Sequence, residues 1–257
     1  MSVARHEAVS AAIAAAHRDG RTALVGFLTA GFPRRERFRD DLAAVAAAAD
    51  VVEVGVPFSD PMADGTTIQR ASFAALANGV NLPWILGEVA AVTAAGGAPI
   101  LLMSYLNPLL AYGLERLPRA AANAGVSGFI VPDLPFEERA ELKSALDREG
   151  LALVQMVTPV TPPERLERLC ADARGFVYAV TMTGTTGNAA AVPDDVLAYM
   201  DRVRAASRVP VCAGFGIRSR EQVARFAGHV DGVVVGSALV EALERGEDPR
   251  EFLASLR

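Results

Sequence analysis

Three carboxylates lie close together beside one apolar segment of the chain. Glu53 interrupts the valine-rich run VVEVGVP at residues 51–57, and Asp60 and Asp64 follow it in the segment FSDPMADG. A continuous apolar run is typical of a strand covered on both faces, so this run predicts that Glu53 is buried. Burial disfavours the charged form of a carboxyl group and raises its pKa. Glu53 is therefore a candidate to donate or accept a proton near neutral pH.

Each of these acids also has a structural explanation. A buried glutamate can pair with an arginine, although the neighbouring apolar runs contain neither arginine nor lysine. Asp60 precedes a proline and Asp64 precedes a glycine, and both patterns are ordinary in turns. The residues alone therefore leave open which of the two aspartates takes part in chemistry.

Glycines follow three apolar runs in the second half of the chain. They stand in GTTGN at 184–188, in GFGI at 214–217 and in GS at 236–237, the last just before a helical segment. Backbone N–H groups at such glycines can approach an anion closely, and the start of a helix favours negative charge. Each pattern is weak alone, but the three together predict a substrate that carries a phosphate.

Several other kinds of site are disfavoured. Lysine occurs once, at Lys143 in a helical segment, and none of the three histidines lies beside the carboxyl end of an apolar run. A lysine Schiff base and a metal site are therefore not expected. Cys170 and Cys212 lack metal-binding spacing and are expected to be reduced thiols in a cytoplasmic protein. The net charge of −5 and the absence of a long apolar run predict binding to neither nucleic acid nor a membrane.

The elements that must position these residues alternate along the chain. Short apolar runs at 22–31, 51–57, 99–105, 128–135, 151–159, 175–182, 209–217 and 232–240 are separated by helical segments. Eight strands alternating with helices predict an α/β fold, a (β/α)8 TIM barrel, with a doubly wound open sheet as the alternative. Such a barrel would bring the acids and the glycine segments together at the carboxyl ends of its strands.

Two departures from a minimal barrel are expected. Residues 1–21 predict an extra helix before the first strand, and the second and third runs begin far apart, at residues 51 and 99. This spacing predicts an extended loop and helical insertion after the second strand. No linker divides the chain, so we expect a single domain over residues 1–257.

An ordered series of segments over nearly the whole chain resembles the alpha subunit of tryptophan synthase. The segments are GFLTAGFP, VEVGVPFSDPMADGTTIQ, LLMSYLNP, VPDLP, FVYAVTMTGTTG, GFGI and VVVGSALV. The resemblance implies a carbon–carbon lyase of L-tryptophan biosynthesis. Its reaction is the retro-aldol cleavage of indole-3-glycerol phosphate to indole and glyceraldehyde 3-phosphate.

The resemblance also assigns residues. The family's catalytic pair falls on Glu53 and Asp64, which selects Asp64 over Asp60. The positions that surround the substrate fall on Phe27, Ile68, Tyr105, Asp133, Tyr178 and Thr186. The phosphate-binding positions fall on Gly187, Gly214, Phe215, Gly216, Gly236 and Ser237.

A partner follows from the resemblance as well. It implies a beta subunit that holds pyridoxal phosphate and receives indole within an alpha-beta-beta-alpha tetramer, with no cofactor in this chain. Three alternatives stay open. They are a freestanding lyase that acts without a beta subunit, another phosphate-binding barrel enzyme, and a non-catalytic scaffold chain that retains the fold.

Overall fold

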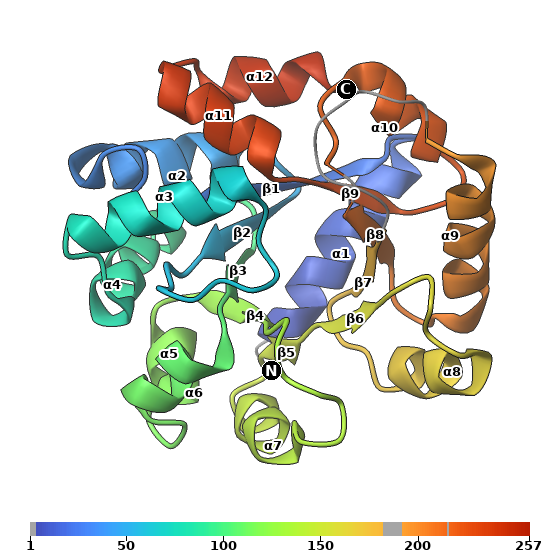
Figure 1. Ribbon diagram of the computed structural model, residues 1–257, viewed down its shortest axis with the longest axis horizontal. Helices are drawn as coiled ribbons and strands as arrows, with labels where there is room; N and C mark the ends of the chain where they lie inside the picture. Colours follow the sequence, from blue (N-terminus) through green and yellow to red (C-terminus); the bar gives the residue numbers. More distant parts are fainter. Residues whose placement is uncertain (1–3, 182–191, 215) are drawn as a thin grey trace.

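One parallel sheet forms the centre of the molecule (Figure 1). The computed structural model describes residues 4–181, 192–214 and 216–257, and its sheet has the strand order β5-β4-β3-β2-β1-β9-β8-β7-β6. The strands are β1 (Ala23–Thr29), β2 (Val51–Gly55), β3 (Ile100–Met103), β4 (Val126–Ile130), β5 (Ala152–Leu153), β6 (Gln155–Val157), β7 (Val177–Val180), β8 (Val211–Gly214) and β9 (Gly232–Val235).

The two edges of this sheet meet at a single interrupted strand. β5 pairs with β4 and β6 pairs with β7, while only Val154 separates β5 from β6. The expected strand at 151–159 is thus present in two pieces that together join the sheet edges. The predicted eight-stranded barrel is confirmed, and the open sheet is excluded.

Helices surround the barrel (Figure 1). They are α1 (Arg5–Arg18), α2 (Phe38–Ala48), α3 (Thr66–Ala77), α4 (Leu82–Thr93), α5 (Leu106–Tyr112), α6 (Leu117–Asn123), α7 (Ala140–Arg148), α8 (Pro163–Ala171), α9 (Asp194–Ala206), α10 (Arg220–Phe226), α11 (Ser237–Arg245) and α12 (Pro249–Ser255), with a 3-10 turn η1 (Arg35–Arg37) before α2. In the described part of the chain no single helix has the length and apolar character needed to cross a membrane; α3 and α4 reach that length only as a pair bent by 101°.

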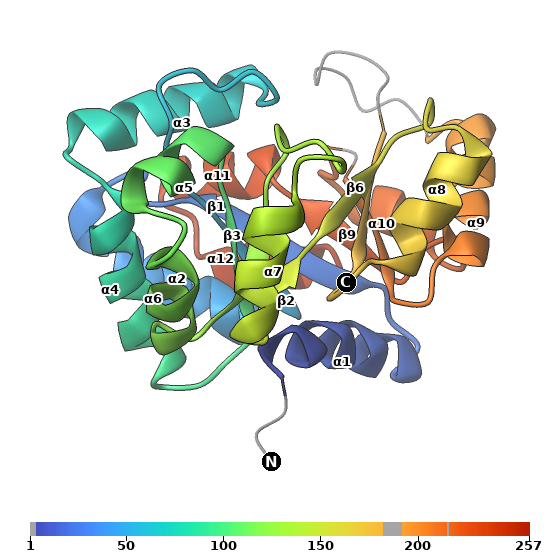
Figure 2. The ribbon, with the colours of Figure 1, turned by 90° about the horizontal axis from the view of Figure 1, so that it is seen from below.

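Helix α1 lies across the end of the barrel at which the strands begin (Figure 2). Its Val9 and Ile13 are fully buried in a cluster with Val25 and Phe176 from the strand segments. The Ser10 hydroxyl donates a hydrogen bond of 2.6 Å to a backbone carbonyl just before β7. The extra N-terminal helix predicted from the sequence is therefore confirmed, and it covers the end of the barrel at which the strands begin.

The long connection between β2 and β3 contains α3 and α4. Gly79 has a φ of +71° between these helices, a conformation that side chains disfavour. The Asn81 side chain then accepts a hydrogen bond of 3.0 Å from the Trp84 N–H and caps α4. The predicted insertion after the second strand is confirmed.

Alternate residues of β2 face opposite sides of the sheet. Val52 and Val54 belong to the apolar cluster that includes buried residues of α2, α4 and α9. Glu53 lies between them, so its side chain points into the barrel interior. The strand register places it level with Phe27 of β1 and Leu101 of β3. A strand covered on both faces thus carries one acid, on its inner side.

Candidate active site

Glu53 is an isolated carboxyl group inside the barrel. It is 1% exposed, and neither of its oxygens has a hydrogen-bond partner among the described residues. Burial, and then the charge of nearby Asp64, raise the pKa of Glu53 from 4.5 to about 8. No arginine pairs with it among those residues, so the side chain is predominantly protonated at neutral pH and can donate a proton.

Asp64 approaches the same interior from the loop between β2 and α3. The Tyr105 hydroxyl accepts a hydrogen bond of 2.8 Å from the Ala63 N–H and also interacts with the Asp64 carboxylate. The Gln69 amide donates to the Asp64 carbonyl at 2.8 Å and to the Pro61 carbonyl at 3.3 Å. Burial raises the pKa of Asp64, while the Tyr105 hydrogen bond acts in the opposite direction. Hydrogen bonds from Tyr105 and from Gln69 therefore hold the loop that carries Asp64 in place.

Asp60 lies in a different environment. Its side chain is exposed and accepts a hydrogen bond of 2.5 Å from the neighbouring Ser59 hydroxyl. It does not line the interior cavity beside Glu53, whereas Asp64 does. The structure thus separates two aspartates that the turn patterns could not distinguish.

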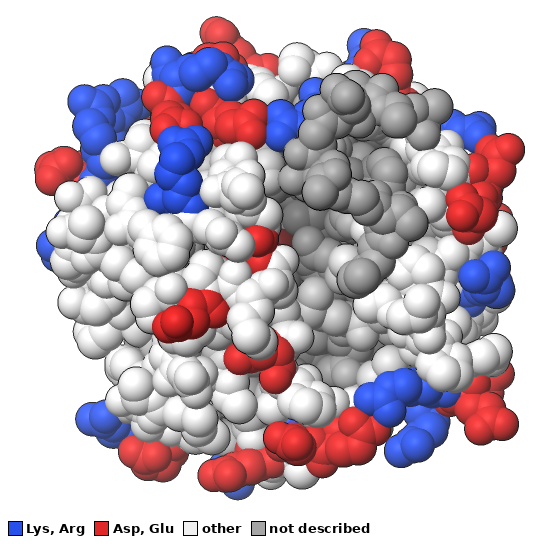
Figure 3. Space-filling view, viewed as in Figure 1, with Lys and Arg blue, Asp and Glu red and all other residues white. Residues whose placement is uncertain are grey.

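A cavity of about 220 Å³ joins Glu53 and Asp64 to Gly214, Gly216 and Gly236, which follow or end strands at the carboxyl end of the barrel. The predicted residues in its lining are Phe27, Glu53, Asp64, Ile68, Tyr178, Gly214, Gly216, Gly236 and Ser237. Their chain positions extend from β1 to the start of α11, so only closure of the barrel brings them together. Figure 3 views this face of the molecule.

Two glycines allow aromatic side chains of the cavity lining to pack directly against the backbone. A Cβ atom on Gly55 would lie 2.6 Å from Cζ of Phe27, and one on Gly214 would lie 2.4 Å from Cε1 of Tyr178. Both distances are below any normal carbon contact, so each ring lies directly over a glycine. Gly214 was expected in the phosphate site, and the structure gives it this additional packing role beside Glu53.

The opposite end of the cavity is built from backbone. Gly216 has a φ of +61°, Gly236 is the N-cap of α11, and Ser237 begins that helix. The first N–H groups of a helix lack partners within it, and its dipole favours an anion at this end. This end of the cavity can therefore bind a phosphate group.

Not every predicted residue lies in this lining. Tyr105 lines an adjoining small cavity with Asp64 and Phe27. The Asp133 carboxylate instead accepts hydrogen bonds of 2.9 and 3.2 Å from the Leu106 N–H at the start of α5, beside Tyr105. Thr186, Gly187 and Phe215 lie outside the described residues.

Four lining residues were not predicted from the sequence. Ala63 and Gly65 flank Asp64 in its loop, Met103 ends β3, and Val234 lies in β9. The strand register places Met103 level with Gly55, one inward position beyond Leu101. The run that contains Met103 is apolar throughout, so the sequence alone carries no signal that this residue points inward, and the strand register was needed to find it.

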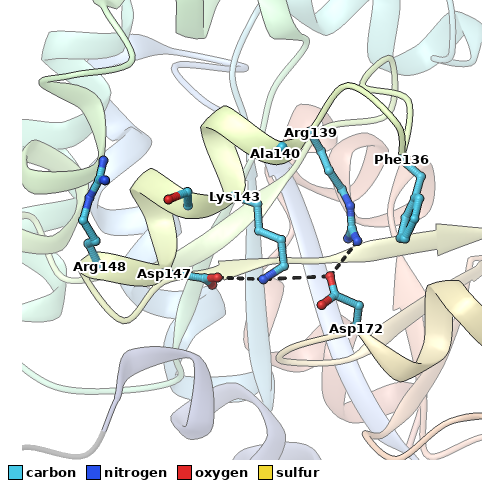
Figure 4. A pocket seen from close by; sticks show the side chains of 8 residues that line it. Phe136, Arg139, Ala140, Lys143, Asp147, Arg148 and Asp172 are labelled. Carbon is cyan, nitrogen blue, oxygen red and sulfur yellow. Dashed lines mark hydrogen bonds and ion pairs between the residues drawn. The ribbon is translucent and has the colours of Figure 1, made fainter.

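A larger hollow, of about 630 Å³, lies outside the barrel along α7 (Figure 4). Its charged groups pair with one another: Arg139 with Asp172 at 2.6 Å, and Lys143 with Asp147 at 2.7 Å. The Arg139 guanidinium also lies 3.6 Å from the centre of the Phe136 ring. These contacts tie α7 to the end of α8. None of the predicted site residues lines the hollow, so it is a poor candidate for the active site.

The described residues of the site do not form a metal-binding cluster. In residues 4–181, 192–214 and 216–257 there is no group of three or more histidine, cysteine or acidic side chains that could hold a metal ion. The chemistry that the geometry offers is proton transfer and electrostatic stabilisation by two carboxyl groups, next to an anion site.

Comparison with known proteins identifies the family. A family model described as tryptophan synthase alpha chain matches residues 13–256. The tryptophan synthase alpha chain of Solidesulfovibrio magneticus is 48% identical over 239 residues, which cover 93% of each chain. That of Geobacter sulfurreducens is 46% identical over 253 residues, again covering 93% of each chain.

Solved structures agree. A chain of Mycobacterium tuberculosis tryptophan synthase superimposes with a TM-score of 0.89 at 39% identity, covering 96% of each chain. The tryptophan synthase alpha subunit of Legionella pneumophila gives a TM-score of 0.86 at 32% identity, covering 97% of this chain and 96% of that one. The chain therefore belongs to the tryptophan synthase alpha chain family, a family of lyases.

Proposed function

We propose that this chain cleaves indole-3-glycerol phosphate to indole and glyceraldehyde 3-phosphate, with Glu53 and Asp64 as its catalytic residues. The observation that carries the proposal is the unpaired, buried Glu53 beside Asp64 in a cavity whose other end can bind phosphate. A protein that serves only as a scaffold has no use for an unpaired buried acid, because such a group destabilises the fold.

Glu53 is the proton carrier in this mechanism. With a pKa of about 8 it is protonated at neutral pH and donates its proton to C3 of the indole ring. The ring becomes an indoleninium cation. The bond from C3 to the glycerol chain then breaks, its electron pair returns to the ring, and the adjacent hydroxyl becomes an aldehyde. The Glu53 carboxylate takes the proton that this hydroxyl loses, which restores the acid.

Asp64 provides electrostatic stabilisation. Its carboxylate would accept a hydrogen bond from the ring N–H, where the positive charge of the intermediate is concentrated. The pKa of Asp64 is raised, but the Tyr105 hydrogen bond opposes that rise, whereas no described partner opposes the rise for Glu53. Environments that separate two carboxyl pKa values let one act as the acid and the other as the anion.

The remaining lining residues suit the substrate. Phe27, Tyr178 and Met103 provide apolar walls for the flat indole ring. Gly236 and Ser237, at the start of α11, would donate backbone N–H groups to the phosphate. Thr186, Gly187 and Phe215 are proposed at this site on the family resemblance alone.

We also infer a partner at the face where the strands end. Large apolar side chains are exposed in segments that follow the carboxyl ends of β2, β3 and β6: Met62 at 85%, Phe73 at 51%, Leu110 at 49% and Val160 at 81%. Exposed large apolar side chains favour a protein interface. The proposed partner is a beta subunit carrying pyridoxal phosphate, in an alpha-beta-beta-alpha tetramer in the cytoplasm, with residues 1–257 acting as one domain.

The proposal is tested by measuring indole release from indole-3-glycerol phosphate with and without a tryptophan synthase beta subunit. Slow release that the partner strongly accelerates would support both the reaction and the coupling. Rapid release by the chain alone would favour a freestanding lyase, with the same catalytic residues. No release under either condition would refute the proposed reaction.

A further inference from the structure

The Glu241 carboxylate joins three segments that border the cavity. One of its oxygens accepts hydrogen bonds from the Thr67 hydroxyl and from the Arg218 guanidinium, both at 3.0 Å. The other oxygen accepts a second guanidinium hydrogen bond from Arg218 at 2.7 Å. A bidentate, charge-assisted contact of this kind fixes orientation as well as distance. Figure 3 shows basic and acidic side chains gathered side by side over α11 and α3.

Each of these three segments also contributes to the proposed active site. Thr67 is in the first turn of α3, directly after the loop that carries Asp64, and Gln69 of the same helix donates to the Asp64 carbonyl. Arg218 follows Gly216, which lines the cavity. Glu241 is one turn along α11 from Ser237, where that helix begins. One carboxylate therefore connects the loop of Asp64 with both backbone segments at the phosphate end.

A second ion pair between the same two helices offers a comparison. Arg70 and Glu244 lie about one helical turn further along α3 and α11 and form a two-point contact, one bond of which measures 2.7 Å. Among the described contacts, Glu244 bonds to no residue of the segment after β8. The two glutamates thus share a helix pair and a type of bond, but only Glu241 reaches the third segment.

We propose that Glu241 is a positioning residue, which keeps the Asp64 loop in register with the two segments that bind the substrate phosphate. This inference rests on the proposed function. A substrate anchored by its phosphate presents its indole ring at a set distance from that anchor. Asp64 must lie at the same distance to meet the ring N–H. Errors of about 1 Å in such placement lower rates by as much as about 100-fold.

The test compares Glu241→Gln with the matched control Glu244→Gln in steady-state indole release. Glu241→Gln is expected to lower kcat roughly 10-fold with little change in KM, because Asp64 is displaced while the phosphate segments persist. Glu244→Gln should change kcat less than twofold. Thr67→Val should lower kcat by about as much as Glu241→Gln does. The double variant Thr67→Val/Glu241→Gln should have a kcat no lower than that of either single variant. Thr67→Ser keeps the hydroxyl and should retain the kcat of the parent.

Hydrogen–deuterium exchange gives a readout that does not need turnover. Inorganic phosphate is expected to slow amide exchange in residues 61–69 of the parent and of Glu244→Gln, but not of Glu241→Gln. Equal kcat losses in the two glutamate variants, or no effect of phosphate on this segment in the parent, would overturn the inference. A parent that shows the exchange effect but releases no indole would refute the proposed function and leave the coupling by Glu241 standing.

Discussion

Replacing Glu53 with glutamine should make the protein more stable at neutral pH while abolishing cleavage. The carboxyl group has a pKa of about 8 in the folded protein and about 4.5 when the chain is unfolded. Between these values the folded protein holds a proton that the unfolded chain has released. Stability is therefore fully present below about pH 4.5 and is lost as the pH rises towards 8, by about 1.4 kcal/mol for each pH unit.

Glutamine keeps the size of the side chain but does not titrate. The difference in unfolding free energy between Glu53→Gln and the parent should therefore be small at pH 5 and reach about 3 kcal/mol at pH 7. It should then level off above pH 8. All other titrating groups are shared by the two proteins, so their contributions cancel in this difference.

The assay is denaturant unfolding of both proteins at a series of pH values from 5 to 9. A difference that does not change with pH would refute the raised pKa. A variant much less stable than the parent at pH 7 would instead indicate that Glu53 is held by an ion pair. Indole release by the same preparations shows whether activity is lost while the fold is kept.

Three other substitutions test the rest of the site. Asp64→Asn should lower indole release by on the order of 100- to 1000-fold, because the positive charge on the indole ring in the transition state loses the carboxylate that stabilises it. The binding of inorganic phosphate, measured by calorimetry, should not weaken. Gly214→Ala should destabilise the protein by about 1–3 kcal/mol in thermal unfolding and lower activity, since the new Cβ would lie 2.4 Å from the Tyr178 ring. In the parent, the hydrogen bond from the Tyr105 hydroxyl lowers the pKa of the Asp64 carboxylate, and Tyr105→Phe removes that hydroxyl. The pKa of Asp64 should then rise, so the acidic limb of the rate profile should move to higher pH; an unmoved limb would contradict this role for Tyr105.

Local patterns were sufficient to predict the barrel and the buried acid Glu53, but they did not distinguish Asp64 from Asp60. Glu53 stands in a valine-rich run of the kind that forms a buried strand, so the run already predicted that this acid lies in the interior. The N-terminal helix was predicted from the residues of segment 1–21, and the insertion after β2 from the spacing of the apolar runs. These features depend on residues close together in the chain.

Features that depend on closure of the barrel were not predictable in this way. The runs that contain Met103 and Val234 are apolar throughout, so they do not distinguish inward from outward positions. The interruption of a strand at Val154 also left no mark in its run. Glu241 stands among charged residues of a helix, a pattern typical of a solvent-facing surface, and its partners are distant in the chain.

The central claim is that Glu53 carries the proton to the indole ring, and the pH dependence of indole release tests it most directly. The measurement is kcat/KM for indole-3-glycerol phosphate from pH 7 to pH 9.5, which reports the essential acid of the free enzyme. Because Glu53 must be protonated, the value should fall about tenfold per pH unit above a pKa of about 8, and Glu53→Gln should show no activity at any pH. A rate that stays constant up to pH 9.5, or activity that persists in Glu53→Gln, would contradict it.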